Sequence, residues 1–398
     1  MSSYLSVWDT LNKVEGLFRN PNVSLWKRKF WLENERSLSS PSSSLANSFI
    51  ITHNPDHKRM KRPPSTTVAP SVALVSRPYN PEAFNFTKAS LREVVCLVKL
   101  RANEPPSFSW LSPLTNAGDN FDLASFPSND LDVHPVFVNV SPIFRGHGLF
   151  VPQVLRGNAQ VASTSLLTLG VRLTLLFANE TSDFKCGFNS LSAFASVNHF
   201  HLHTIFASSL QPNEVKDERS NTLPCEAAPL GKLLWQRTIT DKDQGDAILT
   251  CNVHDWIIPG FVYSIQRAQD RGDSSSVNHN LTEKQITEIS NAAGRLVERL
   301  VRSEIPHHFL ISEGGSKVYV WPRKPQVPSF NDRSQMALLE CAGVLILNEG
   351  SAYDESSIDK VTVSELHEEL TTNVAQPSDV LDKIVQEEIE AERIDSLS

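Results

Sequence analysis

Three histidines stand at alternate positions in the stretch ASVNHFHLHTIF, which covers residues 195–206; they are His199, His201 and His203. The alternation with apolar residues predicts a β-strand, in which successive side chains point to opposite faces. The three imidazoles would then line one face of the strand at intervals of about 6.5 to 7 Å. Such a row can form a transition-metal site with nitrogen ligands, or a site of nucleotidyl transfer in which one histidine attacks a phosphate.

A metal site would require the three rings to converge on one ion at about 2 Å, which a straight strand makes difficult. The five cysteines, at positions 96, 186, 225, 251 and 341, are scattered, and no carboxylate cluster adjoins the histidines. A single histidine on a strand is usually structural, but three in strict alternation favour chemistry. Because imidazole is largely unprotonated near neutral pH and departs readily once protonated, it suits phosphorus chemistry. We therefore place nucleophilic catalysis first.

The elements that must position these histidines can be read from the residues before them. Residues 134–140 and the stretch LFVPQV, which starts at Leu149, are strand-like and predict a hairpin across the turn SPIFRGHG. The stretch NAQVASTSLLTLGVRLTLLFANE predicts a mostly buried helix, and FKCGFNSL then leads into the histidine strand. The predicted order is a hairpin, a helix and a pair of strands.

The same order recurs once in the second part of the chain. Residues 256–266 are strand-like, and a helix is predicted next, with Thr282 and Gln285 as a capping box at its start. The stretch HHFLISEGGSKVYVWP then predicts two strands joined across Gly314 and Gly315. In this second copy KVYVWP takes the place of the histidine strand. We therefore expect an α+β fold with two related antiparallel sheet-plus-helix halves, the second lacking the catalytic histidines.

Charge is distributed unevenly over the 398 residues, whose formal net charge is −8. Residues 351–398 contain 13 Asp and Glu against 3 Lys and Arg, so the rest of the chain is close to neutral. This acidic segment is typical of a solvated helix or a disordered tail, with a partner-binding arm as the alternative. A neutral body argues against binding of nucleic-acid polymers. A basic run at 58–62 indicates either a surface arm or a nuclear-import signal.

The first twenty residues have neither the basic start nor the apolar block of a secretory signal, and no apolar run is long enough to span a membrane. Together with the unpaired spacing of the cysteines, this predicts a cytoplasmic protein without disulfides or membrane contact. We predict three parts: residues 1–225 with a partly disordered arm at 37–72, residues 226–350, and an acidic tail at 351–398.

The motif at 199–205, His-Phe-His-Leu-His-Thr-Ile, resembles the signature of the histidine-triad superfamily of nucleotide hydrolases and transferases. In that superfamily the middle histidine is the nucleophile, which corresponds to His201. Ser196 and Asn189 precede His201 where the superfamily has groups that position phosphate or ribose. The hairpin also has the superfamily's pattern of Pro142, His147 and Pro152. The resemblance implies a histidine-triad-like fold for residues 1–225, and a degenerate copy of it for 226–350.

A narrower resemblance is to the GDP-hexose phosphorylases, which include an animal GDP-D-glucose branch and a plant GDP-L-galactose branch. It rests on FNFTK at 84–88, NVSPIFRGHGLFVP at 139–152 and GFNSLSAFASVNHFHLH at 187–203. Plant members tend to have Gln at the third histidine position, so His203 indicates the animal branch. At Phe144 and Arg145 the chain departs from the family, which usually has an acidic residue followed by an aromatic one.

The resemblance implies a reaction of GDP-D-glucose with inorganic phosphate. His201 would attack the α-phosphorus and release glucose 1-phosphate, and phosphate would then take up the guanylyl group to give GDP. It also implies that His199 and His203 orient the nucleophile and stabilise the phosphate oxygens. Asn189, Ser196 and His147 would bind substrate. We expect no cofactor and no resident metal ion.

Two alternatives stay open at this point, because water and phosphate would approach the same phosphorus. The first is a nucleotide-sugar or dinucleotide hydrolase of the same superfamily, and hydrolysis can also accompany phosphorolysis as a side activity. The second is a non-enzymatic zinc-binding or adaptor protein that uses the acidic tail as its partner arm. The residues that select the base and the hexose, and the oligomeric state, do not follow from the sequence.

Overall fold

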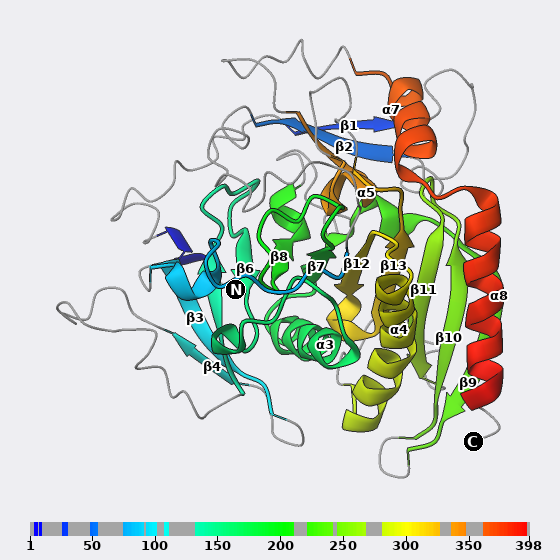
Figure 1. Cartoon of the computed structure of the whole chain (residues 1–398), viewed down its shortest axis with the longest axis horizontal. Coiled ribbons are helices and arrows are strands. Elements are labelled where there is room, and N and C mark those ends of the chain that lie inside the picture. The colour runs from blue at the N-terminus through cyan, green and yellow to red at the C-terminus, as the bar shows by residue number, and fades with distance from the viewer. Residues whose placement is uncertain are drawn as a thin grey trace.

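The computed structural model describes residues 4–6, 8–9, 26–30, 48–54, 75–90, 93–101, 107–110, 132–210, 221–241, 245–267, 281–326, 336–347 and 361–395. Its dominant feature is one large antiparallel sheet (Figure 1). The strands of this sheet follow the order β4 (Ser107–Trp110), β3 (Val94–Lys99), β5 (Val133–Val138), β6 (Gly148–Phe150), β8 (Leu202–Phe206), β7 (Phe184–Asn189), β12 (His307–Ser312), β13 (Lys317–Pro322), β11 (Gly260–Arg267), β10 (Ala247–His254) and β9 (Leu230–Ile239).

The sheet consists of two halves built in the same way. The sequence of elements β5, β6, α3 (Thr164–Ala178), β7 and β8 recurs as β10, β11, α4 (Glu283–Arg302), β12 and β13. Within each half, the two strands after the helix pair with each other and with the hairpin before it. The halves join through antiparallel pairing of β7 with β12. This is the α+β arrangement of two related halves that the sequence predicted.

Both central helices cover the same face of the sheet, where they lie side by side (Figure 1). The helix α3 begins at Ser163, whose side chain accepts a hydrogen bond from the backbone of Leu166, and its apolar residues are buried. The helix α4 begins with the predicted capping box of Thr282 and Gln285. Apolar side chains of the strands that point to this face, such as Leu202 and Phe206, form the main core with the two helices.

The opposite face carries a smaller sheet and a short helix. Strands β1 (Trp26–Phe30), β2 (Ser48–His53) and β14 (Val344–Leu347) form this sheet, in which β14 and β2 run parallel. The helix α5 (Leu338–Cys341) comes directly before β14 and contacts β7 and β12. A second core lies here, and it includes Tyr319 and Trp321 from β13. The strand that takes the place of β8 in the second half is therefore packed with aromatic side chains on this face.

Several expectations from the sequence are confirmed: the hairpin of β5 and β6, both helices, and the two strands β12 and β13 across Gly314 and Gly315. The histidine strand is shorter than predicted, because β8 starts at Leu202. Residues 195–201 form an irregular segment before the strand, so only the third histidine is in it. The long strands β9 and β10 were not predicted.

Residues 361–395 of the acidic segment are helical, which is one of the two predicted forms, but one face of them is packed against the second half rather than solvated. This segment forms α7 (Val363–Glu369), a single π-helical turn (Leu370–Val374) and α8 (Ser378–Asp395). The helix α8 lies beside β9 (Figure 1) and buries Ile384, Glu388 and Glu392, and ion pairs from Arg295 and Arg299 connect it to α4. Glu392 accepts hydrogen bonds from Arg237 and Arg295 at 2.8 and 3.0 Å. The acidity therefore neutralises arginines of the second half.

The other predicted terminal features fall largely outside the described residues. The basic run at 58–62 lies entirely outside them. Of the arm at 37–72, residues 48–54 are described; they contain β2, and Phe49 is buried there. In the described part of the chain, no helix has both the length and the apolar character needed to cross a membrane.

We predict that Glu392→Ala lowers the free energy of unfolding by about 1 to 2 kcal/mol, because it removes a nearly buried carboxylate shared by Arg237 and Arg295, which keep Glu288 and Asp395 as their other partners. Urea unfolding followed by circular dichroism measures the change. Lys383→Ala is the matched control on the same helix, since the Lys383 side chain is 79% exposed. Equal stability of the two variants would mean that α8 is not an integral part of the fold.

Candidate active site

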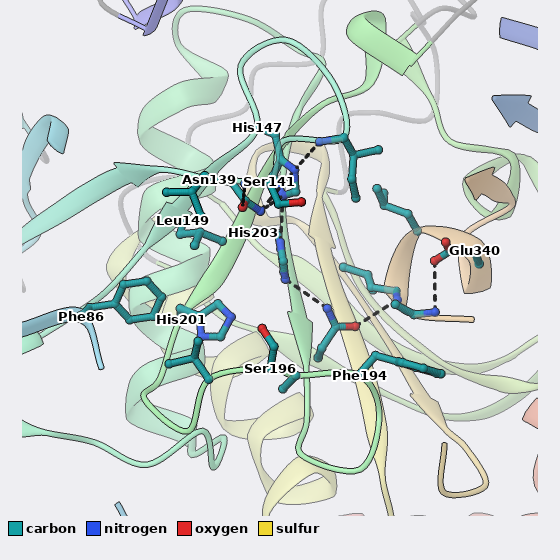
Figure 2. Close-up of a pocket in the computed structure, with 18 residues that line it drawn as sticks. Phe86, Asn139, Ser141, His147, Leu149, Phe194, Ser196, His201, His203 and Glu340 are labelled. Carbon is teal, nitrogen blue, oxygen red and sulfur yellow. Dashed lines mark hydrogen bonds between the residues drawn. The ribbon is translucent and has the colours of Figure 1, made fainter. Parts of the chain in front are cut away.

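A pocket lies on the face of the sheet that faces away from α3 and α4 (Figure 2). Its walls come from the turn after β5, the end of β7, the loop at 190–197, the start of β8 and the helix α5. The residues that line it are Phe86, Asn139, Val140, Ser141, Ile143, His147, Leu149, Asn189, Phe194, Ala195, Ser196, Val197, His201, His203, Ala337, Leu338, Leu339 and Glu340. Five of the six residues predicted for the site are among them.

His201 is held in one defined state. Its Nδ1 lies 2.8 Å from the carbonyl oxygen of His199, and since a carbonyl can only accept, Nδ1 must carry the proton. In the neutral ring Nε2 is then the unprotonated nitrogen. Burial lowers the pKa of His201 to about 4, with the bond to the His199 carbonyl as a smaller opposing effect. The ring is therefore neutral and nucleophilic at physiological pH.

The backbone of His201 is fixed by Gln160, which the sequence analysis did not single out. The Gln160 side chain accepts a hydrogen bond from His201 N at 2.9 Å and donates to the His201 carbonyl at 3.2 Å. It also donates to the carbonyl of Asn189 at 2.9 Å. Since Gln160 is fully buried, the three bonds form without competition from water. One side chain thus ties the end of β7 to the start of β8.

His203 is the centre of a hydrogen-bond chain that Figure 2 shows as dashed lines. Its Nδ1 lies 2.9 Å from Nε2 of His147, and its Nε2 lies 3.1 Å from Nδ2 of Asn189. The Asn189 side-chain oxygen accepts from the backbone of Leu338, in α5, at 3.0 Å. These hydrogen bonds connect the β5–β6 turn of the first half with α5 of the second half. They hold the rings of His147 and His203 in place at the pocket wall.

The turn that carries His147 is itself anchored from several sides. Gly146 has φ +87°, a left-handed conformation that glycine adopts without strain. The backbone of Ile143 donates to Nδ1 of His147 at 3.1 Å, and the ring of Phe144 stacks on the imidazole with centroids 4.7 Å apart. Phe144, a departure from the family pattern, therefore packs against a site residue. Its neighbour Arg145 pairs with Asp9.

The expectation that three imidazoles line one surface is wrong for His199. This ring is fully buried, and it is not among the residues that line the pocket. Its Nδ1 accepts a hydrogen bond from the backbone of Phe86 at 3.1 Å, and burial lowers its pKa to about 4. The reason is that residues 195–201 are not extended like a strand, so alternation does not govern them. What His199 contributes to the pocket is its carbonyl, which fixes His201.

Phe86 links this buried histidine to the pocket. It begins the short 3₁₀ helix Phe86–Lys88, which Asn85 caps by accepting a hydrogen bond from the backbone of Thr87. The ring of Phe86 lies 5.2 Å from that of His201, between centroids, and lines the pocket. The motif FNFTK therefore folds into a local structure that covers one side of the nucleophile. Its position beside the histidines could not be read from the sequence.

Other pocket residues were missed because they come from distant parts of the chain. Phe194 is in the same loop as Ser196, whose exposed side chain borders the pocket. The helix α5 with Glu340 belongs to the second half and lies more than a hundred residues after the motif. The spacing of residues around the histidine motif gives no indication that these residues contact the pocket. Among the described residues, no group of three or more His, Cys, Asp or Glu side chains is arranged to hold a metal ion.

Comparison with known protein families identifies the family of this chain. Residues 44–205 match the family model described as the GDPGP1-like N-terminal domain, and residues 233–386 match the GDPGP1-like C-terminal domain. The two models together cover most of the chain, and they do so in the expected order. The chain belongs to the GDPGP1-like family. The C-terminal domain of the family extends into α8, in agreement with the packing of that helix.

Curated relatives of this GDPGP1-like chain are phosphorylases. The chain is 28% identical to bovine GDP-D-glucose phosphorylase 1 over 253 residues, which cover 62% of this chain and 57% of the bovine protein. It is 25% identical to the human protein of the same name, over 90% of this chain and 80% of the human one. GDP-L-galactose phosphorylase 2 of Arabidopsis thaliana is 31% identical over 47% of this chain and 39% of its own length.

A solved structure shows the same fold. The yeast Ap4A phosphorylase Apa2 superimposes with a TM-score of 0.50 over 94% of each chain, at 12% sequence identity. At this level of identity the likeness concerns the arrangement of helices and strands. It establishes the histidine-triad-like fold that the sequence motif implied for the GDPGP1-like chain.

We predict that acid weakens the fold through its buried histidines. Burial lowers the pKa of His199, His201, His254 and His307 from 6.5 to about 4. The unfolded chain takes up these protons below about pH 6.5, whereas the folded chain does so only near pH 4, so the free energy of unfolding should fall as the pH drops across this window. Urea unfolding at several pH values measures the slope. A slope no shallower in His201→Asn than in the unsubstituted chain would contradict the low pKa of His201.

Proposed function

We propose that this chain is a GDP-D-glucose phosphorylase, which converts GDP-D-glucose and inorganic phosphate into GDP and D-glucose 1-phosphate. The observation that carries the proposal is the hydrogen bond between His201 Nδ1 and the His199 carbonyl, inside a pocket lined by both polar and apolar side chains. It leaves Nε2 of a neutral imidazole as the nucleophile. The names of the bovine and human relatives support the choice of substrate.

In the first step Nε2 of His201 attacks the α-phosphorus of GDP-D-glucose. A bond forms between nitrogen and phosphorus, and the bond from that phosphorus to the bridging oxygen breaks, which releases D-glucose 1-phosphate. The guanylyl group stays on His201. Because Gln160 fixes the backbone on both sides of this residue, the ring keeps its orientation as the bond forms. In the second step an oxygen of inorganic phosphate attacks the same phosphorus and frees Nε2, giving GDP.

Negative charge on the phosphate oxygens needs donors that are already in place. We assign this role to the hydroxyl of Ser196, which lines the pocket beside His201, and we assign His203 the support of the nucleophile, since both of its ring nitrogens already bond to His147 and Asn189. His203 lies close to the nucleophile, with ring centroids 5.6 Å apart. Asn189 and His147 bond to the two nitrogens of His203, so we assign them its orientation. His199 would act through its carbonyl, by fixing the tautomer of the nucleophile.

We further propose that the protein works in the cytoplasm. All five cysteines of the chain are free and buried, which suits a reducing compartment. Burial also raises the pKa of Cys96 and of Cys186, so these thiols stay protonated and unreactive.

Incubation with GDP-D-glucose in the absence of phosphate should add one guanylyl group to the peptide that contains His201. The His201→Asn variant should lose this label completely, because Asn offers no nitrogen nucleophile. Intact-mass and peptide mass spectrometry measure the label. His367→Asn makes the same substitution on an exposed helix and serves as the control. A label that persists in His201→Asn would assign the nucleophile to another residue.

Turnover of GDP-D-glucose should require inorganic phosphate, and GDP should be the nucleotide product. Chromatography of the nucleotides, with and without phosphate, separates this outcome from hydrolysis. Release of GMP at the same rate in both conditions would make the protein a hydrolase. A panel with GDP-mannose and ADP-glucose then tests whether the pocket selects the hexose and the base.

A further inference from the structure

The loop at 190–197 precedes the nucleophile and contains an unfavourable backbone. Ser192 has φ 60° and Phe194 has φ 69°, both in the left-handed region that side chains other than glycine rarely adopt. Such residues persist only where the surroundings hold them, and they gather at functional sites. The same loop contributes Phe194 and Ser196 to the pocket wall. Something outside the loop must therefore keep it in this conformation.

The contacts that do so come from the second half of the molecule. The backbone N–H of Gln326 donates to the carbonyl of Ser192 at 2.7 Å, and its side-chain oxygen accepts from the backbone of Phe194 at 2.6 Å. The guanidinium of Arg323 lies over the ring of Phe194, 5.3 Å from the centroid. Both left-handed residues are thus held from segment 323–326.

Arg323 also reaches the opposite wall of the pocket. Its guanidinium donates to the carbonyl of Met336 and lies 3.2 Å from Nε2 of His308. Met336 leads directly into α5, whose Leu338 donates to Asn189. One buried side chain therefore connects the loop of the first half with the helix of the second.

The tail fixes segment 323–326 in turn. The backbone of Lys324 donates to the carbonyl of Val374 at 2.9 Å, and the side chain of Gln376 donates to the carbonyl of Arg323 at 2.5 Å. An isolated antiparallel bridge joins Arg323 to Ala375. The connection runs from the tail through segment 323–326 to the loop at 190–197.

We propose that Arg323 and Gln326 are positioning residues, which pre-form the pocket wall made by Phe194 and Ser196. The proposal rests on the proposed function for its substrate, GDP-D-glucose. Without the two contacts the left-handed loop would relax, and only a fraction of the molecules would have a complete pocket. Substrate binding would then have to restore the conformation of the loop, which lowers the apparent affinity for the substrate. Once the substrate is bound the loop is in place, so the rate of reaction of the complex stays the same.

Gln326→Leu tests this, because the Gln326 side chain is exposed and its replacement leaves the core intact. We expect KM for GDP-D-glucose to rise about 5-fold, the effect of losing one hydrogen bond, while kcat changes less than about 2-fold. Gln326→Glu keeps an oxygen that accepts from Phe194 and should retain the original KM. Gln236→Leu, on the exposed side of β9, is the matched control.

Hydrogen–deuterium exchange of the peptide that covers 190–197 gives a readout independent of turnover. Exchange should be faster in Gln326→Leu and unchanged in Gln326→Glu, with the same melting temperature in both. Unchanged exchange in Gln326→Leu, or faster exchange with an unchanged KM, would overturn the proposal. If the unsubstituted chain does not turn over GDP-D-glucose, the proposed function fails, and the apparent dissociation constant for GDP replaces KM in this comparison.

Discussion

The antiparallel pairing of β7 with β12 is the constraint on which the arrangement of the site depends. It merges two half-sheets into one and sets Asn189 opposite His308. Because β7 also pairs with β8, the strand of His203 lies only two strands from the second half. The second half can therefore supply one wall of the pocket, through α5, and can support the other through segment 323–326. A shift of the β7–β12 register would move both walls relative to His201.

The two halves have the same arrangement of strands and helix, but different side chains occupy the site face. On the site face, β8 of the first half carries His203 at the edge of a pocket. The corresponding face of β13 carries Tyr319 and Trp321, which pack into a core, with Trp321 donating to His254. Imidazoles occur in both places, but His254 of the second half lies in a packed interior, where Nδ1 accepts from Trp321 and Nε2 donates to the carbonyl of Cys225. The packed aromatic side chains on this face of β13 favour a rigid second half, and rigidity is what the pocket wall requires.

Burial and hydrogen bonding act together on the histidines. Removal from water keeps the His201 ring neutral, and the carbonyl of His199 decides which nitrogen carries the proton. Around this ring, Gln160 and the chain through His203, Asn189 and Leu338 satisfy the polar groups that burial would otherwise leave unpaired. The chemistry of the nucleophile is thus a product of packing as much as of residue type.

The sequence by itself determined the repeated order of elements, the start of α4 and the identity of the nucleophile candidate, since these depend on local spacing and on motifs. It also led to one error and missed one contact, for the same reason. Alternation placed all three histidines on one strand, whereas the chain is irregular up to His201. Charge predicted a solvated helix or a disordered tail, and it did not show that one face of the helix binds arginines of β9 and α4. Only the tertiary structure decided which distant groups meet at the pocket: Gln160, α5 and segment 323–326. The physical reason is that local patterns record the preferences of a segment, while burial and pairing depend on which surface another segment presents to it.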